Sequence, residues 1–427
     1  MSITSQSPVT TWLSTDVVER TASWQAVQRC HDVVEVRTFD PGQRSEPPAG
    51  HALVRISAAG ICGADIRVVT GNKASTGDVE RPTTLGHEAV GVIEQIDTNA
   101  ETLRPGDRVV VLPHLLSTQQ VELAGDRVDP RRIGAGHTLH MGWDIDGVFA
   151  DYTVVPTTHL VRVAEEYLEQ AEMFAPELGE AVFAFTEPML CTLSAYDLAR
   201  QAERMLNYPL LQPGGSALVL GCGPIGILHA VALRDLGYDV TLHDPATERL
   251  RFARWCLGFG RPLENLPNQQ FDLVMATSSS ADAIRNGERQ VRDGGLLYLF
   301  AGLNTSERDA MDGTRTFYYE RVHRIAQPIV TSIDVDGRNK RIVYLGHSGY
   351  RDQLAPQAIA TVAAHAAALG RAITGVIPDW NSPTLLDRHG HTPDWSTPDG
   401  SPALVAVLHG DAIRTQHIKT IICPGHH

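Results

Sequence analysis

The chain has few cysteines and no long apolar run. Six cysteines are scattered through 427 residues, and none forms a Cys-x-x-Cys pair. Disulfide-rich secreted domains and cysteine-rich zinc modules need more thiols at closer spacing, so both classes are excluded. No apolar stretch approaches the roughly 20 residues that cross a bilayer, and no basic segment precedes an apolar one near residue 1. We therefore expect a cytoplasmic protein with reduced thiols and no membrane partner.

Basic residues are also in short supply. The sequence has 36 Lys and Arg against 50 Asp and Glu, which gives a formal net charge of −14. An acidic chain without a basic cluster repels phosphate backbones, which excludes nucleic acid as the main partner. The content of 43% hydrophobic and 20% charged residues is that of a globular protein, and the length predicts two domains or three.

The first 160 residues predict a unit rich in strands. Residues 51–60, 89–96, 105–113 and 147–156 are short apolar or alternating runs bounded by turns. Residues 1 to about 45 are weakly patterned, and we interpret them as a peripheral extension.

The pattern changes near residue 195. Over 216–303, apolar strands alternate with amphipathic helical stretches, which predicts βαβ units and a parallel sheet. An Ala-rich helix is expected at 356–370, a surface loop at 388–402 and a closing strand at 419–423.

A glycine-rich motif opens the βαβ region. The segment Gly221-Cys222-Gly223-Pro224-Ile225-Gly226 follows an apolar strand directly and opens a helix. In a dinucleotide site, the first glycine makes the tight turn, the second admits the pyrophosphate, and the third lets helix and strand pack closely. The helix N-terminus then offers free N–H groups to the phosphates. The alternative is a glycine-rich turn that binds nothing.

Asp244 is the second part of the dinucleotide-binding pattern. It ends the next strand, 23 residues after Gly221, close to the spacing expected for a carboxylate that binds the adenosine ribose. Such a carboxylate accepts the ribose hydroxyls and repels a 2′-phosphate, so the pattern favours NAD over NADP.

Three potential metal ligands lie in the strand-rich region. Cys62 stands in GICGAD, and His87 and Glu88 follow 25 residues later in LGHEAVG. Each has a simpler interpretation, as a buried thiol, a core histidine or a paired acid. Glu88 sits in an apolar stretch where an unpaired carboxylate is costly, and Cys, His and Glu are ligands that zinc accepts. Glu187, in FTEPML, is a fourth candidate.

These motifs resemble the zinc-dependent medium-chain alcohol dehydrogenases, in the branch of sorbitol, threonine and polyol dehydrogenases. The resemblance runs from about residue 24 to the C-terminus and includes GICGAD, LGHEAVGVIE, PGDRVVV, TEPM and LGCGPIG. It implies that Cys62, His87, Glu88 and Glu187 bind the catalytic zinc or its water. It also implies that Asp65, three residues after Cys62, orients the zinc histidine.

The resemblance implies an α/β fold of two domains. A GroES-like, strand-rich catalytic domain would comprise residues 1–200 and 345–427. A doubly wound Rossmann domain, residues 201–344, would be inserted between its two parts. Relatives form homodimers or homotetramers by joining Rossmann sheets edge to edge. We expect LLYLFAGL, residues 296–303, near that edge.

The chain departs from the family in three places. Residues 112–146 contain no cysteine, so we expect one catalytic zinc and no structural zinc. His137 and His140 in that segment have HxxH spacing but are interpreted as part of a loop, and His114 either faces the active site or is a surface residue. Ala64 replaces the Ser or Thr that relays the substrate proton.

Arg67 is the third departure, because it stands where relatives often continue the relay with a histidine. It would either recognise an anionic substrate group or pair with a neighbouring acid.

The expected function is hydride transfer between NAD and a secondary alcohol or ketone. By resemblance, the small-molecule substrate is a polyol, sugar, cyclitol or amino alcohol, with zinc lowering the pKa of its hydroxyl. A biosynthetic ketone or aldehyde reductase is an alternative, since the chemistry is reversible. A catalytically silent NAD-binding protein is another, which a zinc content near zero would favour.

Overall fold

We describe a computed structural model of the chain. The structure describes residues 24–30, 33–39, 47–70, 83–97, 102–116, 138–266, 269–303, 307, 309, 311, 313–387, 393–397, 402–409 and 419–424. The chain divides into two compact units: one comprises residues 1–187 and 359–427, and the other comprises residues 188–358. The boundaries after residues 200 and 344 that the sequence suggested stay predictions.

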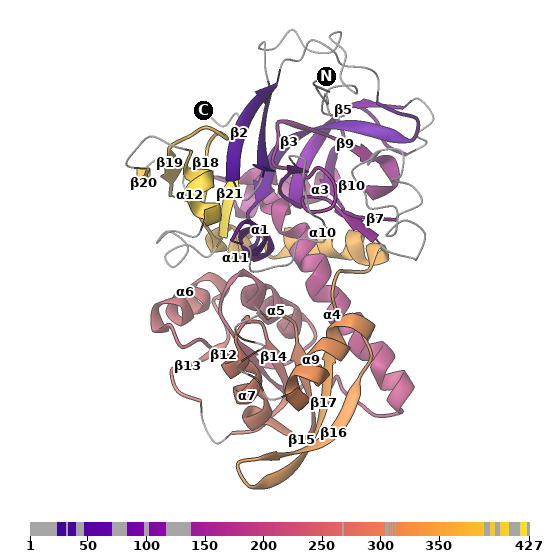
Figure 1. The fold of residues 1–427 in the computed structure, drawn as a ribbon, viewed down its shortest axis with the longest axis vertical. Coiled ribbons are helices and arrows are strands. Elements are labelled where there is room, and N and C mark those ends of the chain that lie inside the picture. The colour runs from indigo at the N-terminus through magenta and orange to yellow at the C-terminus, as the bar shows by residue number, and fades with distance from the viewer. Residues whose placement is uncertain are drawn as a thin grey trace, which may run out of the picture. The chain divides into compact units, whose positions relative to one another are not determined.

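The first unit is built on a nine-stranded sheet (Figure 1). Its central strand β3 (His51–Gly60) pairs antiparallel with β5 (Glu88–Ile96), with β9 (Tyr152–Pro156) and with β21 (Lys419–Ile422). The remaining strands are β6 (Arg108–Val111), β10 (Leu160–Arg162), β18 (Ile373–Ile377), β19 (Thr384–Leu386) and β20 (Pro393–Ser396). The closing strand predicted at 419–423 is β21, and it pairs with residues of β3 that lie more than 300 positions earlier in the chain.

Short elements surround this sheet. They are β1 (Trp24–Cys30), β2 (Val33–Phe39), α1 (Gly63–Val69), β4 (Thr83–Thr84), β7 (His114–Leu116), β8 (Thr138–His140), η5 (Thr157–His159), α3 (Glu165–Phe174), η6 (Gly179–Phe185), α11 (Ala366–Ala372) and α12 (Ala403–His409). The part of the N-terminal extension that is described is not irregular: β1 and β2 form an antiparallel hairpin, and β1 also pairs with β4.

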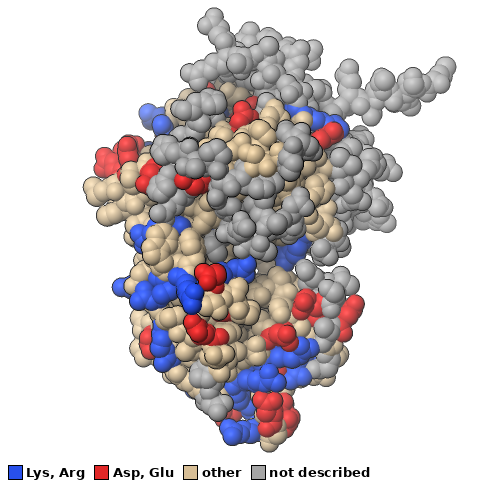
Figure 2. All heavy atoms as spheres, turned by 90° about the vertical axis from the view of Figure 1, so that its left-hand side faces the viewer, with Lys and Arg blue, Asp and Glu red and all other residues tan. Residues whose placement is uncertain are grey.

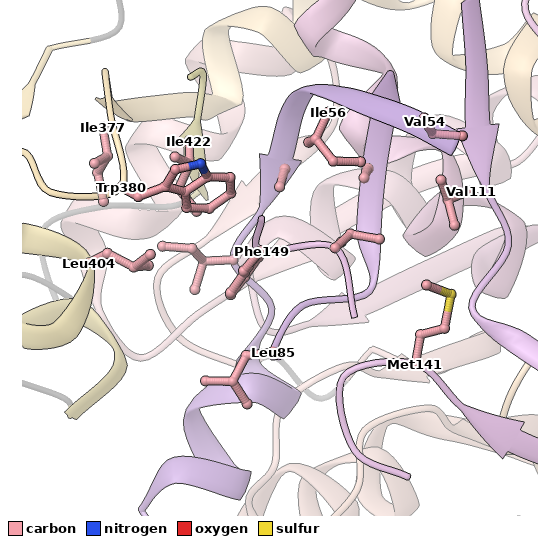
Figure 3. Packing of buried hydrophobic residues seen from close by; sticks show 14 of the residues in the cluster. Val54, Ile56, Leu85, Val111, Met141, Phe149, Ile377, Trp380, Leu404 and Ile422 are labelled. Atoms are coloured by element: carbon pink, nitrogen blue, oxygen red, sulfur yellow. The ribbon is translucent and has the colours of Figure 1, made fainter. Parts of the chain in front are cut away.

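One apolar core holds the first unit together. Figure 3 shows Phe149, Trp380 and Ile422 among its members, from three distant parts of the chain. The Trp380 ring is fully buried, and its Nε1 donates to Asp151 Oδ1 at 2.8 Å. Leu85, two residues before His87, belongs to the same core. The segment that carries His87 is thus anchored by burial of its apolar neighbours.

The second unit contains a seven-stranded sheet in the order β13-β12-β11-β14-β15-β17-β16. Its strands are β11 (Ser216–Leu220), β12 (Asp239–His243), β13 (Arg261–Leu263), β14 (Phe271–Ala276), β15 (Val291–Leu299), β16 (Ile329–Val335) and β17 (Arg338–Gly346). Its helices are α4 (Thr186–Leu206, which begins in the first unit), α5 (Pro224–Asp235), α6 (Thr247–Leu257), α7 (Ala281–Gln290) and α9 (Gly313–Ile325). All pairs are parallel except β16 with β17, so the predicted doubly wound sheet is confirmed.

Two sequence-based expectations about the part of the chain after residue 290 were wrong. The strand within residues 296–303 is not at the edge of the sheet, because β17 and then β16 lie beyond β15 (Figure 1). The hairpin of β16 and β17 comes later in the chain, so the alternating pattern upstream could not reveal it. The Ala-rich stretch is not one helix either: α10 (Ala355–Ala364) and α11 are separated at His365.

The segment 388–402 was expected to be a surface loop, and most of it lies outside the described residues. Its described part includes β20, which pairs with β19 and extends the sheet of the first unit. Among the described residues, no helix is long and apolar enough to cross a membrane.

Candidate metal and dinucleotide sites

Helix α1 begins at the first candidate ligand. Cys62 is its N-cap residue, and its Sγ accepts a hydrogen bond from the Ala64 backbone N–H at 3.4 Å. Asp65 completes a capping box, because its Oδ2 accepts from the Cys62 backbone N–H at 2.9 Å. Such a box satisfies two backbone donors that a helix start leaves open. The spacing of Cys62 and Asp65 in GICGAD is therefore what fixes the local geometry of the thiol.

Asp65 also fixes the second ligand. Its Oδ1 lies 3.0 Å from His87 Nδ1, and both side chains are buried. A carboxylate can only accept, so Nδ1 carries the proton and Nε2 is left for a metal. Burial by itself lowers the pKa of His87, but the charges of Asp65 and Cys62 outweigh it and raise that pKa well above its ordinary value.

Glu88 is the first residue of β5 and is buried beside an unexpected partner. Its Oε2 forms an ion pair with Lys419 Nζ, which also donates to the Ile61 carbonyl at 3.1 Å. Burial lowers the pKa of Lys419, but the Glu88 carboxylate more than compensates and raises it. Gly60 makes room for the pair, since a Cβ there would overlap Glu88 Oε2.

The three ligands predicted from the sequence lie together. One donor atom each from Cys62, His87 and Glu88 lies within 4.8 Å of the other two, and this is the one such group among the described residues. A thiol, an imidazole nitrogen and a carboxylate at this spacing fit a zinc ion with an open position. Glu187 is buried in the first turn of α4 but is not part of this group.

Ala64 and Arg67, the two other departures from the family pattern, lie on α1. Ala64 is buried at the start of the helix and has no hydroxyl with which to relay a proton. Arg67 lies in the last turn of α1, is half-buried and is not part of the ligand group. Its role in substrate recognition stays a prediction.

Sequence reasoning missed two features of this site. Lys419 stood in KTIIC, which was interpreted only as a strand. Lys419 begins a mostly apolar strand, and a buried charge is costly unless it is paired. This lysine could therefore have indicated a buried acidic partner. His140 was assigned to a loop, but its ring lies 5.1 Å from that of His87 between centroids. His114 pairs with His140 across β7 and β8, so it lies near the metal group.

The glycine-rich loop of the second unit connects β11 to α5. Gly221 has φ of +106°, which favours glycine, and a Cβ on Gly226 would overlap the Gly221 carbonyl oxygen. Gly223 differs, because it has φ of −73° and a Cβ there would meet nothing within 4 Å. Pro224 and Ile225 begin α5 with no side chain capping its N-terminus. The loop therefore leaves open space at an uncapped helix start, which fits a pyrophosphate.

Asp244 ends β12 beside this loop. Its Oδ2 accepts from the Cys222 backbone N–H at 2.8 Å, and its Oδ1 accepts from that of Ala246 at 2.9 Å. Only 4% of its side chain is exposed. Arg249 Nη1 lies 3.8 Å from Asp244 Oδ2. The carboxylate thus stabilises the loop itself, and a cation stands next to it.

The comparisons with known proteins concern the family and the fold. Residues 48–165 match the family model of the alcohol dehydrogenase GroES-like domain. Residues 48–165 therefore carry an alcohol dehydrogenase GroES-like domain, and the chain is similar to the zinc-type medium-chain alcohol dehydrogenases. The two-domain fold of a GroES-like unit and a Rossmann unit, predicted above, is thereby confirmed. The curated relatives are polyol, sugar and threonine dehydrogenases, which supports a nicotinamide-linked alcohol oxidoreductase.

Three similar proteins illustrate the relationship. D-altritol 5-dehydrogenase of Agrobacterium fabrum is 29% identical over 263 residues, which are 59% of this chain and 69% of that protein. L-threonine 3-dehydrogenase of Thermococcus kodakarensis is 26% identical over 224 residues, 52% of this chain and 55% of that protein. The structure of Haloferax mediterranei glucose dehydrogenase in complex with NADP, Zn and gluconolactone aligns with a TM-score of 0.62 at 20% identity, over 93% of this chain and 98% of that one.

Proposed function

We propose that the protein is a zinc-dependent dehydrogenase that transfers a hydride between NAD and a secondary alcohol or its ketone. The observation that carries the proposal is the group of Cys62, His87 and Glu88, whose donor atoms lie within 4.8 Å of one another. In this proposal Glu187 is the fourth ligand and no structural zinc is present. The substrate is a polyol, sugar, cyclitol or amino alcohol, a class favoured by the likeness to altritol and threonine dehydrogenases.

When bound, zinc supplies a Lewis acid for the substrate oxygen and the nicotinamide supplies the hydride acceptor. The chain's own residues prepare that chemistry. Asp65 holds His87 in the tautomer that leaves Nε2 for the metal, and it caps the backbone N–H of Cys62. Lys419 compensates the buried negative charge of Glu88. Ala64 has no hydroxyl with which to relay the proton released by the substrate. In this proposal that proton leaves through water, another hydroxyl of the substrate or another side chain.

Asp244 supports NAD as the coenzyme. His243 beside it donates from Nδ1 to the Leu263 carbonyl at 2.8 Å, so this nitrogen is not available to a coenzyme. Arg249 acts in the opposite direction, because a guanidinium near the ribose attracts a 2′-phosphate. We therefore propose a preference for NAD that Arg249 makes incomplete. We also propose a cytoplasmic homodimer or homotetramer with no nucleic-acid partner.

The test is a screen of purified, metal-quantified protein with NAD and NADP against polyols, cyclitols, amino alcohols, phosphorylated sugars and simple alcohols. We expect about one zinc per chain and NADH formation that a chelator abolishes and zinc restores. Cys62→Ser and His87→Gln should lose both the metal and the turnover. Metal-free wild-type protein that binds NADH without turnover would contradict the proposal and favour a silent NAD-binding protein. Assays with NADH and ketones distinguish a reductase.

The charges on one face of the molecule do not indicate the charge of the substrate. On the face shown in Figure 2, Lys and Arg lie interspersed with Asp and Glu among the described residues. An anionic substrate would instead be recognised locally, and Arg67→Gln tests that recognition. A loss of turnover confined to acidic substrates would assign this role to Arg67.

A further inference from the structure

A segment downstream of the ligands packs against the backbone of residues 84–86, which immediately precede His87. The backbone N–H groups of Gly147, Val148 and Phe149 donate to the carbonyls of Thr84, Gly86 and Leu85 at 2.8, 3.0 and 2.8 Å. Gly142 has φ of +83°, and a Cβ there would lie 2.7 Å from the Gly86 carbonyl oxygen. Gly142 and residues 147–149 are thus held against the residues that immediately precede His87.

This segment brings two rings to the edge of the His87 imidazole. His140 and Trp143 stack on each other with centroids 3.5 Å apart and planes 8° from parallel. His87 meets both edge-on, with centroids 5.1 Å from His140 and 5.2 Å from Trp143. His114 meets the His140 ring edge-on at 4.6 Å. One planar stack therefore borders the ring of the ligand His87.

The stack is itself rigid. The His140 backbone N–H donates to Asp144 Oδ2 at 3.0 Å, and His140 Nδ1 donates to the Met141 carbonyl at 2.6 Å. The backbone N–H groups of Trp143 and Asp144 donate to the His140 carbonyl, which closes a tight turn. Neighbouring rings held by such hydrogen bonds restrict the tilt of an imidazole packed against them.

We propose that His140 and Trp143 are positioning residues for the metal site, which hold the plane of the His87 imidazole. The hydrogen bond from Asp65 sets the tautomer, but one bond leaves the ring free to tilt about it. The aromatic stack removes that freedom, so Nε2 stays directed at the other ligands. This inference rests on the proposed metal site. His140 and Trp143, in the cysteine-free segment 112–146, thus support the catalytic metal.

The experiment uses the full-length protein with cobalt in place of zinc. Cobalt reports ligand geometry through its absorption bands, so the readout does not depend on turnover. Trp143→Ala should weaken metal binding by about 10–100-fold, as loss of a ligand's support does, and should alter the cobalt spectrum. Trp143→Phe and His140→Phe keep a flat ring and should stay within about threefold of wild type. Trp255→Ala is the control, because Trp255 is 48% exposed and lies in the other unit.

Fluorescence provides a second measurement. Cobalt at the ligand group should quench Trp143 emission, and Trp143→Phe should remove that quenching while it still binds one metal. This comparison holds even where Trp143→Ala does not fold. Wild-type affinity and spectrum in folded Trp143→Ala, or undiminished quenching in Trp143→Phe, would overturn the positioning role alone. Failure of the wild type to bind cobalt or zinc would overturn the proposed function and this inference together.

Discussion

Lys419 and Glu88 form an ion pair that is almost fully buried, with side chains 3% and 1% exposed. The two residues are 331 positions apart and meet where β21 and β5 both pair with β3. A buried charge is costly unless it is paired, so each side chain offsets the free-energy cost of burying the other. The pair therefore couples closure of the first sheet to the construction of the metal site.

Removal of one partner of this pair should destabilise the fold strongly. Lys419→Met leaves the Glu88 carboxylate buried without its cation, at a cost of about 3–5 kcal/mol in the free energy of unfolding. The double variant Lys419→Met with Glu88→Gln should recover much of that loss. Urea unfolding of the metal-free proteins measures both. Equal destabilisation by the single and double variants would show that the charge pairing is not what matters.

Asp65→Asn should weaken metal binding by about 10–100-fold, because an amide has one acceptor where the carboxylate serves both His87 and Cys62. Competition with a chromogenic chelator measures the affinity. Asp282→Asn is a matched control, since Asp282 also lies in the first turn of a helix but is 79% exposed. Unchanged affinity in Asp65→Asn would remove Asp65 from the site.

Two glycines of the same loop should respond differently to alanine. Gly223→Ala places a methyl group in open space at an ordinary φ, so the unfolding free energy should change by less than about 1 kcal/mol. NADH binding, followed by its fluorescence, should weaken at least tenfold. Gly226→Ala should destabilise the fold by about 1–3 kcal/mol, because the Cβ overlaps the Gly221 carbonyl. Normal NADH binding by Gly223→Ala would place the pyrophosphate elsewhere.

Arg249→Gln should sharpen the preference for NADH over NADPH by roughly tenfold. The variant removes the cation 3.8 Å from Asp244, so the carboxylate repels a 2′-phosphate without opposition. Fluorescence titration with both reduced coenzymes measures the ratio without a substrate. Arg251→Gln is the control, because Arg251 instead lies close to Glu248 and Glu264. An unchanged ratio would exclude Arg249 from coenzyme selection.

Stability should fall as the pH drops below about 6.5. Burial lowers the pKa of His159 to about 4, of His229 to about 3 and of His347 to about 4. The unfolded chain binds these protons near pH 6.5 and the folded chain does not, so acid favours unfolding between pH 6.5 and 4. Each histidine contributes roughly 3 kcal/mol or less across this range.

Urea unfolding at pH 7, 5.5 and 4.5 gives the proton uptake that accompanies unfolding. His159→Gln should reduce that uptake by up to one proton and flatten the slope. Stability that is independent of pH over this range would show that these histidines titrate alike in both states.

The sequence by itself determined the local features of this protein. Helix α1 follows from GICGAD because Cys62 and Asp65 have the spacing of a capping box. The turn at Gly221 and the alternation over 216–303 indicated the Rossmann unit because each depends on neighbouring residues. The proximity of Cys62, His87 and Glu88 was inferred from residue types and from the resemblance, and the structure brings those three together.

Only the tertiary structure decided what depends on contacts between distant segments. Lys419 reaches Glu88 because β21 and β5 lie on either side of β3. The stack of His140 and Trp143 reaches His87 because residues 147–149, just downstream of it, hydrogen-bond to residues 84–86. β15 lies inside its sheet because a later hairpin covers it. No local pattern records such pairings, since they arise from which strands and segments pack together once the chain has folded.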